Sequence, residues 1–335
     1  MPTLSVALIT YNQEAFVAEA LHSLLTQDHP GFELVLADDA STDRTREVIE
    51  ATLAAYPHPH IRVVRAYRPA NGGVLNNVNG AMAACTGEVI VAAAGDDISE
   101  PTRLRVIEEA FLDPTVQLVC TNYQKVDVWG RPFGTPPPKP AGGRFSHRTH
   151  PRFYGGAPVC GATAAYRASL FRDFGPMQMG THGEDNCYWI RALLRGVIHY
   201  DDRPLLRWRQ HGANLSNSAA EGFVTPESRA RHLRWLQAHE TMGPQWERDT
   251  RLAVERGWVS RWQGRRVLAM SRRECARWAV YRCTLDIAAW SEWIAAAQPL
   301  FWSFRWGFLF RSLKQRVSER RRERLWSWWA RVRVG

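Results

Sequence analysis

Short, unbroken apolar runs alternate with stretches of helical periodicity through the first hundred residues of the chain. Strands are expected at residues 4–10, 32–37, 61–66 and 89–94, and helices at residues 14–26, 44–56 and 75–85. Apolar runs without polar alternation are typical of parallel strands that helices cover on both faces. The regular alternation of strand and helix predicts an α/β fold with a doubly wound, mostly parallel, Rossmann-like sheet.

The pattern becomes less regular in the following hundred residues. A strand is expected at Val116–Tyr123, with Lys125–Trp129 as its hairpin partner. Residues 130–156 are rich in proline and glycine, and a loop of this length is usually functional or mobile. A helix is expected to open at Gly183-Glu184-Asp185 and to end at Gly196, before a strand near Leu205–Trp208.

Polar residues follow the expected strands directly. Tyr11 follows the first, Asp39 the second and Asp96-Asp97 the fourth, so all three should meet at the carboxyl edge of the sheet, where such folds bind ligands. An aromatic ring, an acceptor for a base N–H and paired carboxylates that suit Mg²⁺ or Mn²⁺ favour a nucleotide site. Taken alone, Asp96-Asp97 fits a solvated turn before the next helix equally well.

Seven motifs stand in the order and spacing of family 2 glycosyltransferases. They are Val6–Asn12, Asp38–Asp43, Asn71-Gly72-Gly73 with Asn79-Gly80, Gly95-Asp96-Asp97, Pro101–Leu104, Gly183-Glu184-Asp185 and Arg209–Ser216. The chain resembles this family over residues 4–220. The resemblance implies the GT-A fold and transfer of a sugar, with inversion, from a nucleotide-sugar donor. It says almost nothing about residues 230–335.

The resemblance also implies roles for residues at the sheet edge. Thr10, Tyr11, Asn12 and Asp39 would form the nucleotide site, with Tyr11 and Asp39 holding the base. Asp96 would lie near the ribose, and Asp97 would coordinate a divalent metal, Mn²⁺ or Mg²⁺.

One position departs from the family pattern. Val78 stands where the family often has a basic residue before Asn79. A phosphate contact is therefore either missing or supplied by Arg65 or Arg68.

The loop at residues 130–156 is assigned to the acceptor side because of its length. The resemblance implies acceptor roles for later residues. Asp185 would be the general base that takes the proton of the acceptor hydroxyl, and Glu184 would orient the acceptor. Without the family, favourable helix capping explains both carboxylates better. His211 would approach the metal or the diphosphate, whereas a lone histidine is more often structural.

Composition limits the class of protein. The chain is 45% apolar and 23% charged, as in globular proteins. Its six cysteines form no CxxC pair, and its first residues enter a strand without an apolar leader. Reduced thiols and no leader predict a cytoplasmic protein.

Charge and tryptophan both concentrate toward the C-terminus. Residues 303–335 contain ten arginines and lysines against two glutamates, and twelve of the fifteen tryptophans lie at or beyond Trp235. We therefore divide the chain into a GT-A catalytic domain, residues 1–222, and a helical, basic, Trp-rich region, residues 223–335.

The C-terminal region carries two apolar stripes among arginines. The first comprises Phe308, Leu309, Phe310, Leu313 and Val317, and the second comprises Leu325, Trp328, Trp329 and Val332. Amphipathic helices of this kind lie on anionic membranes, here the inner face of the cell membrane. The apolar run at Trp293–Phe304 is too short to span a bilayer. A helical cap or a solvated basic tail are the alternatives, and no nucleic-acid module accompanies the arginines.

The sequence thus predicts an inverting glycosyltransferase that uses a nucleotide-sugar, taken as UDP-linked, and a saccharide or lipid-linked saccharide acceptor of the cell surface. A sugar nucleotidyltransferase is a second hypothesis, although Thr10-Tyr11-Asn12 is not the Gly-rich basic loop of that class. A catalytically degenerate, membrane-bound scaffold is the third. The sequence leaves open the sugar, the base, the acceptor and the oligomeric state.

Overall fold

The computed structural model describes residues 1–135, 143–145, 161–178, 183–212, 214, 230, 233, 236–237, 241–285, 290–301, 309 and 312. The chain forms two compact units. The first comprises Met1–Met179, Gly183–Asn214 and Asp249–Ser260, and the second comprises Gly180–His182, Leu215–Arg248 and Arg261–Gly335. The predicted boundary at residue 222 lies outside the described residues.

One twisted sheet organises the first unit. Its strands are β1 (Leu4–Thr10), β2 (Phe32–Asp38), β3 (Ile61–Arg65), β4 (Val89–Ala94), β5 (Ile98–Ser99), β6 (Val116–Val126), β7 (Pro132–Gly134), β8 (Gly143–Phe145), β9 (Ala164–Arg167) and β10 (Val197–Arg209). They run in the order β3-β2-β1-β4-β9-β6-β10-β5, while β7 pairs with β6 and β8 with β10. The first four strands are parallel, with Ala7 of β1 opposite Val35 of β2 and Ala92 of β4. β9 is antiparallel to its neighbours, and β10 is parallel to β6.

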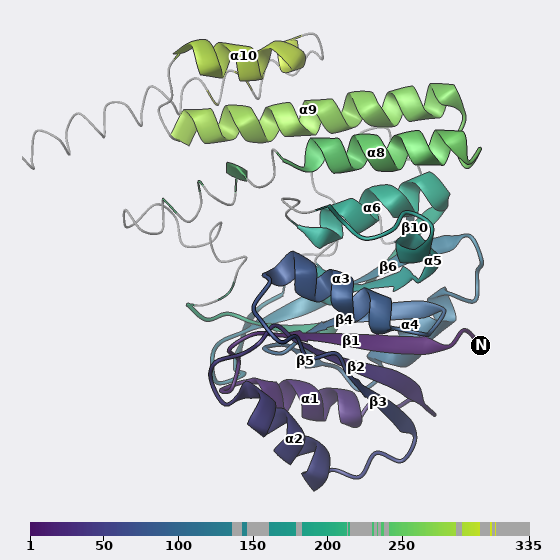
Figure 1. Ribbon diagram of the computed structural model, residues 1–335, viewed down its shortest axis with the longest axis vertical. Helices are drawn as coiled ribbons and strands as arrows, with labels where there is room; N and C mark the ends of the chain where they lie inside the picture. Colours follow the sequence, from purple (N-terminus) through teal and green to yellow (C-terminus); the bar gives the residue numbers. More distant parts are fainter. Residues whose placement is uncertain are drawn as a thin grey trace, which may run out of the picture. The chain divides into compact units, whose positions relative to one another are not determined.

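Helices cover both faces of this sheet. They are α1 (Val17–Leu25), α2 (Thr45–Ala55), α3 (Val74–Ala84), α4 (Arg103–Ala110), the 3₁₀ turn η1 (Gly161–Thr163), α5 (Ser169–Arg172) and α6 (Glu184–Arg195). In Figure 1, α1 and α2 lie below the sheet, and α3 and α6 lie above it. The chain passes from β3 through α3 to β4, on the far side of β1, so the carboxyl ends of β1 and β4 flank the point where the winding reverses. The predicted doubly wound, mostly parallel sheet is confirmed.

Apolar side chains from β1, β2 and β4 form one core with α1, α2 and α4. Leu8, Leu21, Leu36, Val91 and Ile107 are completely or almost completely buried in it. The unbroken apolar runs of the sequence follow from burial on both faces of these strands, because α3 covers the opposite side of β1 and β2.

Three predictions for the second half of the sheet were wrong. The predicted loop at residues 130–156 contains the strands β7 and β8. β6 continues to Val126, and its hairpin partner is β7, not Lys125–Trp129. The turn forms at Asp127, whose Oδ1 accepts from the amides of Trp129 and Arg131, both at 2.9 Å. β10 starts at Val197 rather than near Leu205, because the strand continues through the polar segment 201–204, where its register with β6 shifts.

The second unit is helical in its described part. α9 (Arg261–Leu285) and α10 (Trp290–Phe301) pack together through Ala276, Val280 and Trp293. α8 (Met242–Glu255) begins in this unit and enters the first unit at Asp249. Among the described residues, no helix has both the length and the apolar character needed to cross a membrane.

The two predicted apolar stripes lie outside the described residues, except for Leu309. Leu309 is 4% exposed and packs with α9 and α10. The nearby Ser312 hydroxyl lies 2.5 Å from that of Thr284 on α9. These two positions therefore belong to a packed helical cluster.

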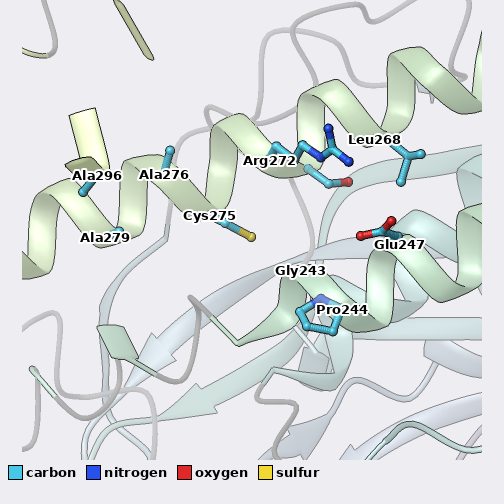
Figure 2. Close-up of a pocket in the computed structure, with 10 residues that line it drawn as sticks. Gly243, Pro244, Glu247, Leu268, Arg272, Cys275, Ala276, Ala279 and Ala296 are labelled. Carbon is cyan, nitrogen blue, oxygen red and sulfur yellow. The ribbon is translucent and has the colours of Figure 1, made fainter. Parts of the chain in front are cut away.

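An open groove of about 570 Å³ lies among the helices of the second unit. Figure 2 shows Gly243 and Pro244 of α8 facing Cys275 and Arg272 of α9. Its walls are formed mainly by small residues, and their missing side-chain volume is what leaves the space open.

Candidate active site

The loop after β1 is fastened to the loop after β2. Asn12 adopts a left-handed backbone conformation (φ 51°), and its amide donates to Ser41 Oγ at 2.9 Å. Asn12 Oδ1 accepts from the Thr42 amide at 2.8 Å. The neighbouring Tyr11 is 44% exposed. Asn12 thus fixes the loop, and Tyr11 presents an aromatic ring to solvent.

Asp38, the last residue of β2, is a buried structural carboxylate. It accepts from the Thr10 hydroxyl at 3.1 Å, from the Ser41 amide at 3.0 Å and from the guanidinium of Arg46. The Thr10 side chain is therefore committed to Asp38, and at 2% exposure it stands behind the site rather than within it.

Asp39, the next residue, organises a different loop. Its two oxygens accept from the amides of Gly72 and Gly73 at 2.9 and 2.8 Å. Arg68 Nε lies 3.0 Å from Asp39 Oδ1. Asp39 is 2% exposed, so it is a nearly buried carboxylate beside the Tyr11 loop, and Arg68 balances its charge.

The structure distinguishes the two arginines considered as substitutes for a basic residue at position 78. Val78 is 4% exposed and packs in the core. Arg65 makes a two-pronged ion pair with Glu50, with distances of 2.7 and 2.6 Å. Arg68 is therefore the one of the two that lies at the Asp39 site.

Asp96 and Asp97 follow β4 after a position that only glycine fits. A Cβ on Gly95 would stand 2.6 Å from Thr10 Cγ2. Asp97 Oδ1 accepts from the Arg209 amide at 3.0 Å, and Arg209 Nε donates to the Asp96 carbonyl at the same distance. Burial, and then the adjacent charge of Asp96, raise the pKa of Asp97 well above its usual range. A bound cation would offset the repulsion between the Asp96 and Asp97 carboxylates.

His211 lies beside this pair of carboxylates. Its Nε2 is 3.0 Å from Asp96 Oδ2, and its ring stacks on Phe16 with centroids 4.6 Å apart. Asn214 closes the loop, because its Nδ2 donates to Asp96 Oδ2 at 3.3 Å and to the Arg209 carbonyl at 3.0 Å. The predicted metal ligand His211 thus reaches the Asp96–Asp97 loop, in contact with Asp96.

Glu184 and Asp185 open α6, where the helix dipole favours negative charge. Asp185 Oδ1 accepts from the Asn186 amide at 2.8 Å. A Cβ on Gly161 would stand 2.7 Å from Glu184 Oε1, so this glycine lets the carboxylate approach η1. Burial, and then the charge of Asp185, raise the pKa of Glu184 to about 7. Burial also raises the pKa of Asp185.

Arg103 connects the two halves of the site. It is fully buried, and its guanidinium donates to Ser99 Oγ (2.9 Å), the Ala92 carbonyl (2.8 Å) and the Ala162 carbonyl (2.7 Å). Its charge lowers the pKa of Asp97 against the larger effect of burial. A buried cation therefore joins the end of β4 to η1, next to the Glu184–Asp185 pair.

All predicted site residues meet at one edge of the sheet. Thr10, Tyr11, Asn12 and Asp39 stand at the ends of β1 and β2, and Asp96, Asp97 and His211 stand after β4 and β10. Glu184 and Asp185 reach the same edge beside η1. The sequence prediction missed the structural roles of Arg103 and Arg209, although both lie in the motifs that carry the family resemblance.

The chain is similar to known proteins in its sequence and in its fold. The family described as Glycosyl transferase family 2 matches residues 5–175. EpsE of Bacillus subtilis (strain 168), which is named as a glycosyltransferase, is 30% identical over 206 residues, 60% of this chain and 70% of EpsE. The uncharacterized glycosyltransferase alr2836 of Nostoc sp. is 34% identical over 124 residues, 37% of each protein. The chain belongs to glycosyl transferase family 2 and is a glycosyltransferase.

Solved structures share the fold. TarS 1–349 of S. aureus, in complex with UDP-GlcNAc, superposes with a TM-score of 0.54 at 19% identity over 91% of this chain and 92% of TarS. The mannosyltransferase PcManGT of Pyrobaculum calidifontis, in complex with GDP-Man and Mn²⁺, gives 0.53 at 17% identity over 94% and 87% of the two chains. The fold is therefore that of the GT-A glycosyltransferases, as the sequence predicted.

Proposed function

We propose that this chain is an inverting, metal-dependent glycosyltransferase that moves a sugar from a UDP-sugar to a saccharide or lipid-linked saccharide acceptor in cell-surface glycan synthesis. The observation that carries the proposal is the meeting of Asp39, Asp96-Asp97 and Glu184-Asp185 at one sheet edge, joined by Arg103 and Arg209. A sugar donor needs a nucleotide site, a partner for its diphosphate and a base for its acceptor, and this edge has groups suited to each.

The donor side begins with the exposed ring of Tyr11, on which a base would stack. Asp39 would accept a base N–H, and Arg68 beside it would face the phosphates. Solved structures of the same fold contain UDP-GlcNAc and GDP-Man, so the fold is compatible with either base. Uracil is the base that we propose.

The metal would be held at Asp97, with His211 and Asp96 beside it. No group of three His, Cys, Asp or Glu side chains able to hold a metal occurs in the part of the chain that the structure describes. Mg²⁺ and Mn²⁺ are commonly bound by one or two carboxylates together with substrate phosphates, and the buried, mutually repelling Asp96-Asp97 pair fits that mode. When bound, the metal supplies charge that stabilises the departing diphosphate.

Asp185 would act as the general base. As the acceptor oxygen forms its bond to the anomeric carbon, the bond from that carbon to the diphosphate oxygen breaks and the acceptor proton passes to Asp185. Burial raises the pKa of Asp185, and a carboxylate with a raised pKa holds the acceptor proton more strongly, which favours this transfer. Glu184 would orient the acceptor hydroxyl. Attack from the face opposite the leaving group inverts the anomeric centre.

Hydrolysis of UDP-GlcNAc and GDP-Man with Mn²⁺ tests this proposal on wild type and Asp185→Asn. We expect wild type to release nucleoside diphosphate, and Asp185→Asn to be slower by about 10²- to 10⁴-fold. Asp28→Asn, which changes the same charge on an exposed side chain, is the control and should match wild type. Equal rates for all three proteins contradict the base assignment. Release of pyrophosphate from a nucleoside triphosphate and a sugar phosphate would instead identify a nucleotidyltransferase.

The basic C-terminal region, residues 223–335, is proposed to bring the enzyme to an anionic membrane surface. The support is its charge pattern, with ten cationic side chains in residues 303–335. Co-sedimentation with vesicles tests it, and we expect binding to phosphatidylserine vesicles that falls with added salt. Equal sedimentation with neutral and anionic vesicles contradicts it.

A further inference from the structure

The β6–β7 hairpin presents large apolar side chains to solvent. Trp129 is 74% exposed and Phe133 is 60% exposed. The turn between them is ordered by Asp127, and Gly130 takes the left-handed conformation (φ 78°) that the turn requires. Trp129 in this turn and Phe133 in the adjoining strand β7 are a candidate binding feature, because clustered exposed apolar side chains mark interaction sites.

Cations accompany the rings of this hairpin and of the adjoining strand β10. The Arg131 guanidinium lies 5.4 Å from the centre of the Trp129 ring, and Lys125 Nζ lies 5.9 Å from that of Trp208. Tyr123 meets Trp208 edge to face at 5.1 Å. Among the described residues, no carboxylate is within ion-pair distance of the Lys125 or Arg131 side chain, so both positive charges remain available to a ligand.

The hairpin is also attached directly to the candidate active site. Arg209 Nη1 donates to the Val128 carbonyl at 2.9 Å, and the Gln210 amide donates to the Val126 carbonyl at 2.8 Å. The amide of the same Arg209 holds Asp97. One buried residue therefore contacts both the hairpin turn and the carboxylate assigned to the metal.

We propose that Tyr123, Lys125, Trp129, Arg131, Phe133 and Trp208, here called the hairpin surface, bind the acceptor, and that this acceptor is an anionic saccharide. Flat rings suit the C–H faces of sugars, and the two cations suit carboxylate or phosphate groups carried by them. Continuity with Asp97 through Arg209 places the hairpin surface beside the reacting centre. This inference rests on the proposed function and adds the chemical class of the acceptor.

Calorimetric titration of the full chain with defined oligosaccharides tests the inference. The probes are tetragalacturonate, which carries carboxylates, a phosphorylated maltotetraose, and neutral maltotetraose. We expect wild type to bind one of the two acidic probes and to bind maltotetraose at least about tenfold more weakly, a difference of about 1.4 kcal/mol. Which acidic probe binds identifies the anionic group.

Three variants locate the binding. Trp129→Ala should weaken it about tenfold or more, and Arg131→Gln should remove most of the preference for the acidic probe. Trp262→Ala is the matched control, since Trp262 is 65% exposed with Arg266 at 4.7 Å over its ring, outside the hairpin surface. It should bind as wild type does.

The inference is overturned if Trp129→Ala and Trp262→Ala bind the acidic probe with equal affinity, or if wild type binds the neutral probe more strongly. It is also overturned if wild type binds neither acidic saccharide and instead binds anionic vesicles through Trp129. The rise in Tm with UDP and Mn²⁺ is measured on the same samples. If that rise is present and the saccharides fail, only the acceptor inference is wrong. If the rise is absent in wild type, the proposed function itself fails.

Discussion

Arg191 of α6 and Asp249 of α8 form an ion pair in which both side chains are completely buried, with Nε and Oδ2 2.7 Å apart. Arg191 Nη1 also donates to the Gly175 carbonyl at 2.9 Å. The pair fastens α6, which begins with Glu184 and Asp185, to a segment far along the chain. Asp249–Ser260 is thus an integral part of the first unit.

Replacing Asp249 by Asn should destabilise the first unit severely. The change leaves the Arg191 charge buried without its counter-charge, which typically costs about 3–5 kcal/mol. Urea unfolding followed by tryptophan fluorescence measures the loss. The control is Asp28→Asn. The Asp28 side chain is 57% exposed in its ion pair with Arg105, and exposed pairs of this kind contribute about 0–1 kcal/mol. Similar losses in both variants contradict the role assigned to the buried pair.

Ala40 carries backbone strain that glycine would relieve. Its φ of 58° lies in the left-handed region, at a cost of about 1–2 kcal/mol for an L residue. Ala40→Gly removes this strain. Glycine also gives the unfolded chain more conformational freedom, which lowers the free energy of unfolding by about 0.4–1 kcal/mol, so the net stabilisation should be about 0.5–1 kcal/mol. Thermal unfolding checks this.

The matched control for Ala40 is Ala51→Gly, on the exposed side of α2. There the backbone is helical, and glycine should destabilise by about 1 kcal/mol. The two substitutions are chemically identical and should move Tm in opposite directions. A fall in Tm for both would show that the strain at Ala40 is not expressed in stability.

Glu184 should make stability depend on pH. Its pKa is raised to about 7 in the folded chain, so the folded state binds more protons than the unfolded state between the ordinary glutamate range and about 7. Stability therefore falls as pH rises through this window. Glu184→Gln removes the ionisation and should raise Tm relative to wild type at pH 8, with little difference at pH 5. Glu47→Gln, at a 72% exposed side chain, controls for the loss of one charge. An equal rise in Tm over wild type at both pH values would contradict the raised pKa of Glu184.

Gly161→Ala should impair catalysis more than folding. The added Cβ would stand 2.7 Å from Glu184 Oε1, the flexible end of that side chain, so Glu184 moves and the backbone stays. Displacing a positioning group by about 1 Å can reduce rates about 10²-fold. Sugar-nucleotide hydrolysis and Tm are measured together. Gly80→Ala, whose Cβ would meet its nearest atom at 3.9 Å, is the control. A large fall in Tm without loss of rate contradicts this reading of Gly161.

The strands and helices of residues 4–110 were predictable because burial on both faces leaves continuous apolar runs. The location of the site at one edge of the sheet could be predicted from these strands, since residues such as Asp39 and Asp97 come directly after parallel strands. β10 was harder to predict. Asp201, Asp202 and Arg203 resemble a loop, and the strand continues past them because β6 pairs with it on both sides of the irregularity, at Asp201 and again at Pro204.

The buried charges could not be predicted from periodicity. Arg103, Arg191 and Arg209 are each 0–1% exposed, yet an arginine in a sequence is usually taken as a surface residue. Each is buried because its partners arrive from distant segments, such as Asp249 for Arg191. The hairpin was misplaced for a related reason. The turn depends on hydrogen bonds to Asp127, which a pattern of apolar residues does not register.

The central claim is that the Asp97 carboxylate links a divalent metal to a nucleotide donor at the end of β4. The most direct measurement is the rise in Tm caused by UDP, with and without Mn²⁺, for wild type and Asp97→Asn. Asparagine keeps an oxygen that can accept from the Arg209 amide while removing the charge that the metal needs. We predict that UDP at about a hundred times its Kd stabilises wild type by about 2.7 kcal/mol only when Mn²⁺ is present, and that Asp97→Asn, folded without ligand, shows no such gain. An equal, Mn²⁺-dependent gain in both proteins would contradict the account.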